Sequence, residues 1–207
     1  MPTAALAAAS ASSHANKVRR RPRRPPCPTA SRDCSASRSN VDRELTVQLA
    51  RITDADPLMR ADAARRLSAS QDPIAVTALL NALDDSEWRV RAAAAASLGA
   101  SGDRRALFPL CRRLEDQRGD VRRAAAEALA ALGDSNATVP LIMALDGERD
   151  SETCRLMVRA LGTVGDDRAL RSLQRLSGSG HWALRREAAD STKKILARGS
   201  QNQEGHT

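Results

Sequence analysis

The chain has 207 residues, 42% of them hydrophobic, and a formal net charge of +8. One Phe, two Trp and no Tyr leave Ala and Leu to fill the core, which favours closely packed helices over other folds. No apolar run approaches the ~20 residues of a spanning helix. The four cysteines have no metal-ligand spacing, and a disulfide framework is not expected at this size.

The positive charge is concentrated in the first 41 residues. They hold eight Lys or Arg and one acid, which leaves 25 bases against 24 acids in residues 42–207. Because the remainder of the chain is nearly neutral, the net charge does not predict nucleic-acid binding.

Residues 1–41 are rich in Ala, Ser, Arg and Pro, and they contain no acid before Asp33. This composition predicts an organelle transit peptide, which would remove Cys27 and Cys34 on cleavage. Two alternatives remain open: a disordered basic tail, or a nuclear localisation patch at VRRRPRR.

A repeat begins beyond residue 41. Residues 90–103 read VRAAAAASLGASGD and residues 121–134 read VRRAAAEALAALGD, 31 residues later. Each period contains two helical stretches with apolar residues at helical spacing, separated by breaks such as Asp-Pro and Gly-Asp. A period of this length with two helices per unit is typical of an α-solenoid.

We therefore predict an all-α fold, an α-α superhelix of about five helix pairs over residues 42–198, followed by a disordered tail at 199–207. The first helices of the pairs are expected near 41–54, 73–84, 103–115, 136–146 and 167–177. The second helices are expected near 57–69, 87–99, 119–132, 151–163 and 181–197.

The units resemble HEAT repeats, in particular the short form of the phycobilisome-lyase-type HEAT-like proteins. The resemblance lies in VRAAAAASLGASGDRRALFPLCRRLED (90–116), VRRAAAEALAALGDSNATVPLIMALDG (121–147) and the looser ALGTVGDDRALRSLQRL (160–176). It implies a solenoid fold and says little about function, because such repeats serve many roles.

HEAT repeats carry an Asp after the first helix and an Arg early in the second. The Asp is expected to accept hydrogen bonds from the next helix N-terminus, and the Arg to pair with carboxylates of adjacent repeats. The residues of this predicted structural ladder are Asp54, Arg60, Asp85, Arg91, Asp116 and Arg122.

The ladder pattern is expected to break in the fourth unit. Gly147 occupies the place of the Asp, Cys154 occupies the place of the Arg, and one extra residue separates them. Asp146, Glu148, Asp150 and Glu152 crowd this loop. The break is either a tolerated insertion, or a bend or acidic contact site.

Tryptophan and arginine side chains on the second helices are the candidate partner contacts. Trp88 and Trp182 occupy equivalent positions three repeats apart, and in HEAT-type arrays the second helices line the concave face. Each Trp either anchors a partner or covers the seam between repeats. Close helix packing explains the alanine run at 92–96, although a groove for a partner helix or a flat apolar ligand is an alternative. The candidate partner-binding residues are Trp88, Arg89, Arg123, Trp182 and Arg186.

No catalytic, cofactor-binding or metal-binding residue can be named. The sequence has three His and no HExxH, P-loop or dinucleotide fingerprint, and Cys154 has no neighbouring His. The resemblance leaves one enzyme class open, the bilin lyases, which attach or remove a tetrapyrrole on phycobiliproteins.

The expected function is a non-enzymatic scaffold or assembly factor that binds a protein partner along the concave face in a plastid, around photosynthetic or tetrapyrrole-handling complexes. A bilin lyase subunit is the first alternative. A cytosolic or nuclear adaptor that retains its basic tail is the second, and mitochondrial import also remains open.

Overall fold

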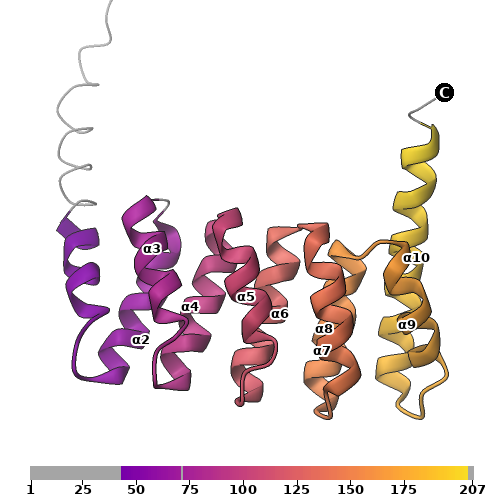
Figure 1. Ribbon diagram of the computed structural model, residues 1–207, viewed down its shortest axis with the longest axis horizontal. Coiled ribbons are helices and arrows are strands. Elements are labelled where there is room, and N and C mark those ends of the chain that lie inside the picture. Colours follow the sequence, from indigo (N-terminus) through magenta and orange to yellow (C-terminus); the bar gives the residue numbers. More distant parts are fainter. Residues whose placement is uncertain (1–42, 71, 205–207) are drawn as a thin grey trace, which may run out of the picture. The chain divides into compact units, whose positions relative to one another are not determined.

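The computed structural model describes residues 43–70 and 72–204, so the predicted leader lies outside the described residues. Within them the chain is helical and contains no strand. Figure 1 shows successive helix pairs side by side in chain order. No helix in this part of the chain is long and apolar enough to cross a bilayer.

The described residues form five helix pairs, which confirms the predicted fold class. A helical segment over residues 43–51 opens the first pair. The elements that follow are α2 (Pro57–Arg66), η1 (Leu67–Ala69), α3 (Pro73–Ala82), α4 (Trp88–Ser101), η2 (Arg104–Ala106), α5 (Leu107–Arg113), α6 (Gly119–Leu132), η3 (Ser135–Ala137), α7 (Thr138–Gly147), α8 (Ser151–Val164), α9 (Asp167–Ser177) and α10 (Trp182–Glu204).

Two features differ from the expected helix boundaries. In the third and fourth pairs, the first helix begins with a 3₁₀ turn, η2 before α5 and η3 before α7. Pro109 and Pro140 lie within the first turn of α5 and α7, where the missing N–H of a proline is tolerated. The last helix, α10, continues to Glu204, beyond residue 198, where the array was expected to end. Residues 199–204 contain no proline that would stop it.

Aspartates begin the first helices and glycines end the second ones. Asp72 accepts a hydrogen bond from the N–H of Ile74 at 2.7 Å, and Asp103 and Asp134 do the same two residues ahead. Gly102 and Gly133 end α4 and α6 at φ 68°, a left-handed conformation that glycine adopts without steric cost. The predicted Gly-Asp turn is therefore confirmed.

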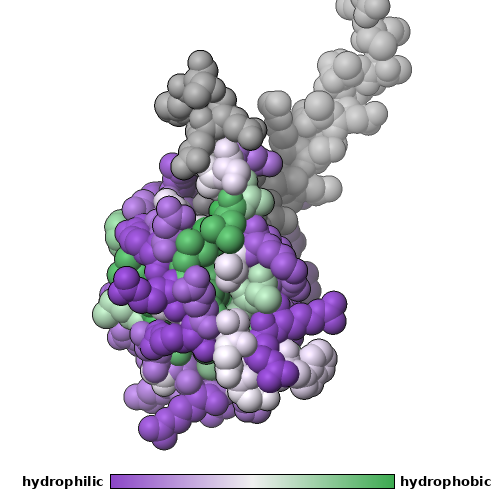
Figure 2. All heavy atoms as spheres, turned by 90° about the vertical axis from the view of Figure 1, so that its right-hand side faces the viewer, coloured by the Kyte–Doolittle hydropathy of each residue, from purple (hydrophilic) through white to green (hydrophobic). Residues whose placement is uncertain are grey.

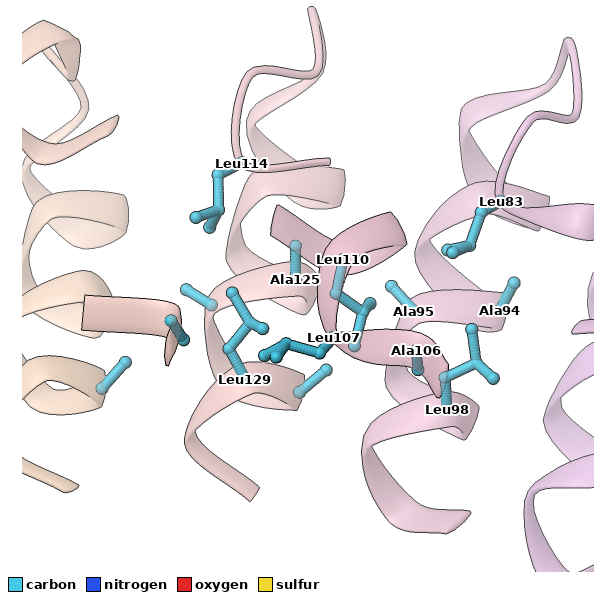
Figure 3. Packing of buried hydrophobic residues seen from close by; sticks show 14 of the residues in the cluster. Leu83, Ala94, Ala95, Leu98, Ala106, Leu107, Leu110, Leu114, Ala125 and Leu129 are labelled. Carbon is cyan, nitrogen blue, oxygen red and sulfur yellow. The ribbon is translucent and has the colours of Figure 1, made fainter. Parts of the chain in front are cut away.

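Leucine and alanine alternate through one continuous core. Leu107 and Leu110 of α5 point between α4 and α6, toward Leu98 and Leu129 (Figure 3). Val90 and Val121 are fully buried, whereas Met59, in the same repeat phase, is 47% exposed. Burial of this apolar surface between repeats is what holds the pairs together, because no pair can cover its own apolar stripe.

The second helices α2, α4, α6, α8 and α10 pack against one another much more extensively than the first helices do. Small residues make this possible. A Cβ added to Gly99 would lie 2.5 Å from the Cα of Ala128, so α4 and α6 meet backbone to backbone there. The hydroxyl of Ser97 donates to the carbonyl oxygen of Ala64 at 2.8 Å, and Ser191 repeats this contact with Val158 at 2.9 Å.

The α9–α10 end of the array is mostly hydrophilic (Figure 2). A narrow apolar strip runs between the polar side chains in that view. Leu196 of α10 is 53% exposed, and Leu170 and Leu176 of α9 are half-buried. Arg198 donates to the carbonyl oxygens of Gly162 at 3.0 Å and Gly165 at 2.9 Å, so α10 also satisfies the C-terminal end of α8.

Candidate functional site

Three arginine–carboxylate pairs join successive repeats, and we call them the ladder: Arg60–Asp85, Arg91–Asp116 and Arg122–Glu148. In each pair the guanidinium of a second helix reaches the turn of the next repeat through two N–H donors. The donor–acceptor distances are 2.7 and 2.8 Å, 2.8 and 2.9 Å, and 2.6 and 3.0 Å along the chain. All six side chains are at least three-quarters buried.

Each ladder residue also fixes a turn within the repeats. The remaining guanidinium nitrogen of Arg91 donates to the carbonyl oxygens of Asp85 and Ser86, at 2.9 and 3.0 Å. The carboxylate of Asp116 accepts from the N–H of Arg118 at 2.9 Å, just before α6 begins. Because the ladder groups bond both across to the next repeat and to the backbone of a turn, the ladder fixes the register of neighbouring repeats.

The sequence predicts that the ladder breaks at Gly147 in the fourth unit, but the structure continues the ladder by one more pair. The next residue, Glu148, accepts the bidentate contact from Arg122 and also accepts from the N–H groups of Arg149 and Asp150 at 2.8 and 2.9 Å. Its longer side chain and the inserted residue restore the position of the carboxylate. The ladder stops one step later, at Cys154.

Cys154 takes the place of a ladder arginine without its charge. Its Sγ lies 3.7 Å from the carbonyl oxygen of Glu148, the equivalent of the backbone contact that the arginines make in their own repeats. Burial raises the pKa of the Cys154 thiol, and the nearby carboxylates of Glu148 and Asp150 raise it further. The thiol is therefore protonated at neutral pH and is a poor nucleophile.

The acidic residues of the 146–152 loop are engaged with protein groups. Asp146 pairs with Arg175 at 2.7 Å, Asp150 begins α8 by accepting from the N–H of Thr153 at 2.8 Å, and Glu152 pairs with Arg155 of the same helix. With Glu148 in the ladder, these carboxylates serve structural contacts. The tolerated insertion is the simpler of the two interpretations of this loop.

The ladder predicts a specific loss of stability in acid. Hydrogen bonds from Arg60 lower the pKa of Asp85. Burial alone would raise the pKa of Asp116 and Glu148, but their hydrogen bonds outweigh it and the pKa of each is lowered. Groups with a lowered folded pKa stabilise the fold above their unfolded pKa of about 4, and this stabilisation is lost as the pH falls through the folded values.

We expect the melting temperature to stay constant from neutral pH to about pH 5 and to fall steeply below about pH 4. Thermal unfolding followed by circular dichroism across this range measures the effect. The control is the triple variant Asp85→Asn, Asp116→Asn, Glu148→Gln, which should be less stable at neutral pH and lose less on acidification. An equally steep acid loss in that variant would contradict the assignment to the ladder.

The exposed sides of α2, α4, α6, α8 and α10 form a surface that we call the second-helix face. It carries all five candidate partner-binding residues. Trp88 is half-buried at the start of α4, and the guanidinium carbons of Arg89 and Arg118 lie over its ring at 4.7 and 4.8 Å from the centroid. Since Arg118 precedes α6, Trp88 also contacts the seam to the next repeat.

Trp88 borders a hollow of about 390 Å³ between α2 and α4. Its floor is formed by alanines of α4, and Arg65 of α2 lies on the opposite rim. The complete lining is Arg65, Trp88, Arg89, Ala92, Ala93 and Ala96. The alanine run therefore does more than allow close packing, because Ala96 remains exposed to solvent as the floor of this hollow.

Trp182 borders a similar hollow of about 330 Å³ between α8 and α10, where Arg186 lines it together with Arg155 and Asp190. Trp182 is 69% exposed, whereas Trp88 is half-buried. Arg123, the remaining candidate, lies on α6 between the two hollows and pairs with Asp120 of its own helix. The structure thus places two tryptophan-bordered hollows in equivalent repeats of one face.

A larger hollow on the first-helix side was not anticipated from the sequence. It measures about 920 Å³ and extends from between α5 and α7 to the ladder residues Asp85, Arg91 and Asp116, which also line it. Phe108 is 73% exposed there and Met143 is 66% exposed. Cys111 lines it, and burial raises the pKa of that thiol to about 11. The available signal was Phe108, the single Phe of the chain, at a helical position next to the core residue Leu107.

In residues 43–70 and 72–204, no group of three or more His, Cys, Asp or Glu side chains is arranged to hold a metal ion.

Comparison with known proteins defines the class of this fold. The family described as HEAT repeats matches residues 44–130 and 76–153, which together cover more than half of the chain. The chain belongs to the HEAT-repeat family.

Among solved structures, the chain is similar to one in the complex of CpcE and CpcF of phycocyanin lyase from Nostoc sp. PCC7120. The TM-score is 0.66 and the sequence identity 27%, over 73% of this chain and 64% of that chain. The chain thus spans less than two thirds of that protein's length. This similarity confirms the resemblance to lyase-type HEAT-like repeats.

Two further solved structures share the fold alone. An engineered protein of a structural genomics consortium has a TM-score of 0.58 at 23% identity, covering 79% of this chain and 84% of that one. A computationally designed armadillo repeat protein for modular peptide recognition has a TM-score of 0.54 at 20% identity, covering 74% and 82%. Comparison with curated proteins gave no match.

Proposed function

We propose that this protein is a HEAT-repeat scaffold that binds a protein partner along its second-helix face. The observation that carries the proposal is the pair of tryptophan-bordered hollows, at Trp88 and Trp182, in equivalent repeats of one continuous face. Tryptophan and arginine are the residues most enriched among binding hot spots, and here both types surround hollows rather than fill the core.

The spacing of the hollows suits a single bound segment. Neighbouring packed helices lie ~8–10 Å apart, so three steps from α4 to α10 give about 24–30 Å. A helix of about 16–20 residues has that length at 1.5 Å per residue. One partner segment could therefore contact both tryptophans while crossing α6 and α8.

We further propose that the protein acts in a plastid, around photosynthetic or tetrapyrrole-handling complexes. Two observations support this: the acid-poor, Arg- and Ser-rich composition of residues 1–41, and the similarity to a chain of a cyanobacterial phycocyanin lyase complex. Mass spectrometry of the native N-terminus tests import, because an intact Met1 would exclude cleavage of a transit peptide.

A subunit of a bilin lyase is a second candidate, favoured by the same 27% identity to the phycocyanin lyase structure. Titration of the protein with a bilin, followed by visible absorption, tests it. An unchanged bilin spectrum, with and without a phycobiliprotein, would exclude this candidate.

The scaffold proposal is tested by site-specific photocrosslinking in native extracts. A photoreactive residue is placed at Ala100 or Ala131, both exposed on second helices, or at Phe108 on the first-helix side. We expect one defined protein to crosslink from Ala100 and Ala131 and not from Phe108. After identification by mass spectrometry, the purified partner should bind the unmodified chain directly.

The same partner should lose affinity at least tenfold when Trp182→Ala removes the exposed indole, since hot-spot truncations cost about 2 kcal/mol or more. The substitution Phe108→Ala is the control and should leave binding unchanged. Crosslinks that form from Phe108 alone would assign the function to the hollow between α5 and α7 and overturn the proposal.

A further inference from the structure

We infer that the hollow beside Trp88 recognises an acidic helical segment of a protein partner, with carboxylates paired to Arg65 and Arg89 around an apolar side chain seated on the alanine floor. This inference deepens the proposed function and rests on it. The argument comes from the distribution of charge over the second-helix face.

Most cations of the C-terminal half of this face are already paired with acids. Arg123 pairs with Asp120, Arg155 with Glu152 at 2.5 Å, Arg159 with Glu127 at 3.5 Å and Lys193 with Asp190 at 3.7 Å. These pairs neutralise that half and leave little net charge for a partner to recognise.

The surroundings of Trp88 are different. Among the described residues, no carboxylate lies within 4.0 Å of a guanidinium nitrogen of Arg65 or Arg118. Arg89 has one partner, Glu87, at 3.1 Å. Two guanidiniums, those of Arg65 and Arg89, thus line the hollow with a single acid between them, and a third, that of Arg118, stacks on the Trp88 ring.

The shape of the hollow specifies the remainder of the ligand. The floor of the hollow is apolar and is formed by the short side chains of Ala92, Ala93 and Ala96. An apolar side chain of the partner can therefore pack between α2 and α4. The indole of Trp88 is held in place by two stacked guanidiniums. Carboxylates on the rim would form charge-assisted hydrogen bonds with Arg65 and Arg89, both of which are exposed.

The helix is the favoured form of this segment because of its spacing. Carboxylates at i and i+7 of a helix lie about 10 Å apart on one face, with the apolar residue at i+3 or i+4 between them. That arrangement places two anions on opposite rims of a small hollow and an apolar group at its centre, as in other helix-in-groove complexes.

The test uses three fluorescently labelled helical peptides of about 16 residues with the same central leucines. They differ only in the flanking residues, which are Glu, Gln or Lys. We expect the Glu peptide to bind the full chain at least tenfold more tightly than the Gln peptide, and its affinity to fall as NaCl is raised. A labelled single-stranded oligonucleotide of similar length is the fourth probe.

The double variant Arg65→Gln, Arg89→Gln should abolish the preference for Glu. Its matched control is Arg104→Gln, Arg171→Gln, which removes two exposed arginines from the first-helix side and should leave the preference intact. Equal binding of the Glu and Gln peptides, no binding of the Glu peptide, or tighter binding of the oligonucleotide would each overturn the inference. The photocrosslinking result would stand or fall independently of these outcomes.

Discussion

Replacement of Asp116 by alanine should lower the free energy of unfolding by about 3 kcal/mol, because it leaves a largely buried guanidinium without its counter-charge. Asp116 is 5% exposed and Arg91 is 14% exposed, so solvent cannot replace the lost contact. The same substitution removes the acceptor for the N–H of Arg118, which opens the turn before α6. Chemical denaturation measures the loss.

The chain offers a matched control at Asp54. This residue occupies the same place in the first repeat and accepts from the N–H of Asp56 at 2.9 Å, as Asp116 does from Arg118. The ladder begins with Arg60, so Asp54 has no pair from a preceding repeat among the described residues. We expect Asp54→Ala to cost about 1 kcal/mol, the net value of one hydrogen bond between a side chain and the backbone.

A double-mutant cycle separates the pair from the turn. The variant Arg91→Met should be destabilised by a similar amount, and the double variant should be less destabilised than the sum of the two, by about 1–3 kcal/mol. If the costs of Asp116→Ala and Asp54→Ala are equal, the contact between repeats contributes nothing and the ladder has no stabilising role.

Substitution of Gly99 by alanine should also lower the free energy of unfolding strongly, although helix propensity alone predicts a gain. Alanine is about 1 kcal/mol better than glycine within a helix. At Gly99, however, the added methyl group would meet the backbone of α6, 2.5 Å from the Cα of Ala128 and 2.7 Å from its Cβ. Separating α4 from α6 also disturbs the core on both sides of the contact, so we expect a net loss of about 2 kcal/mol.

Gly147→Ala is the control for this prediction, since Gly147 is also helical and a Cβ there would meet nothing within 4 Å. That variant should be as stable as the natural chain or slightly more stable. Both variants are compared by their denaturation midpoints. A stabilised Gly99→Ala protein would mean that α4 and α6 can move apart at no cost, contrary to the packing described above.

The fold could be predicted from the sequence because the same core and turn residues recur at the same positions in several repeats. Leu98 and Leu129 recur in register and are both fully buried, and the Gly-Asp turns recur with the same backbone geometry. A pattern repeated at a fixed period is much stronger than any single helix propensity.

The site was less predictable because it depends on side-chain reach rather than on register. In the fourth unit, the sequence position of the ladder aspartate is occupied by Gly147. The carboxylate that pairs with Arg122 comes instead from the next residue, Glu148, which has a longer side chain. Arg118 stacks on Trp88 although the two residues are 30 positions apart in the sequence, and no local sequence pattern predicts this contact. Phe108 has a helix phase peripheral to the core, and the repeat pattern does not distinguish an exposed apolar residue at such a position from a polar one.

The ladder also makes the array mechanically asymmetric. In the described repeats up to α7, its ionic cross-links all lie along the edge where first helices turn into second helices. Along the opposite edge, Asp72, Asp103 and Asp134 bond only within their own repeats. In the repeats up to α7, elastic deformation should therefore be larger along that opposite edge, where neighbouring repeats can separate more easily than along the ionic edge. At the α8–α10 step, Arg198 bonds across that edge to Gly162 and Gly165 and should limit the separation there.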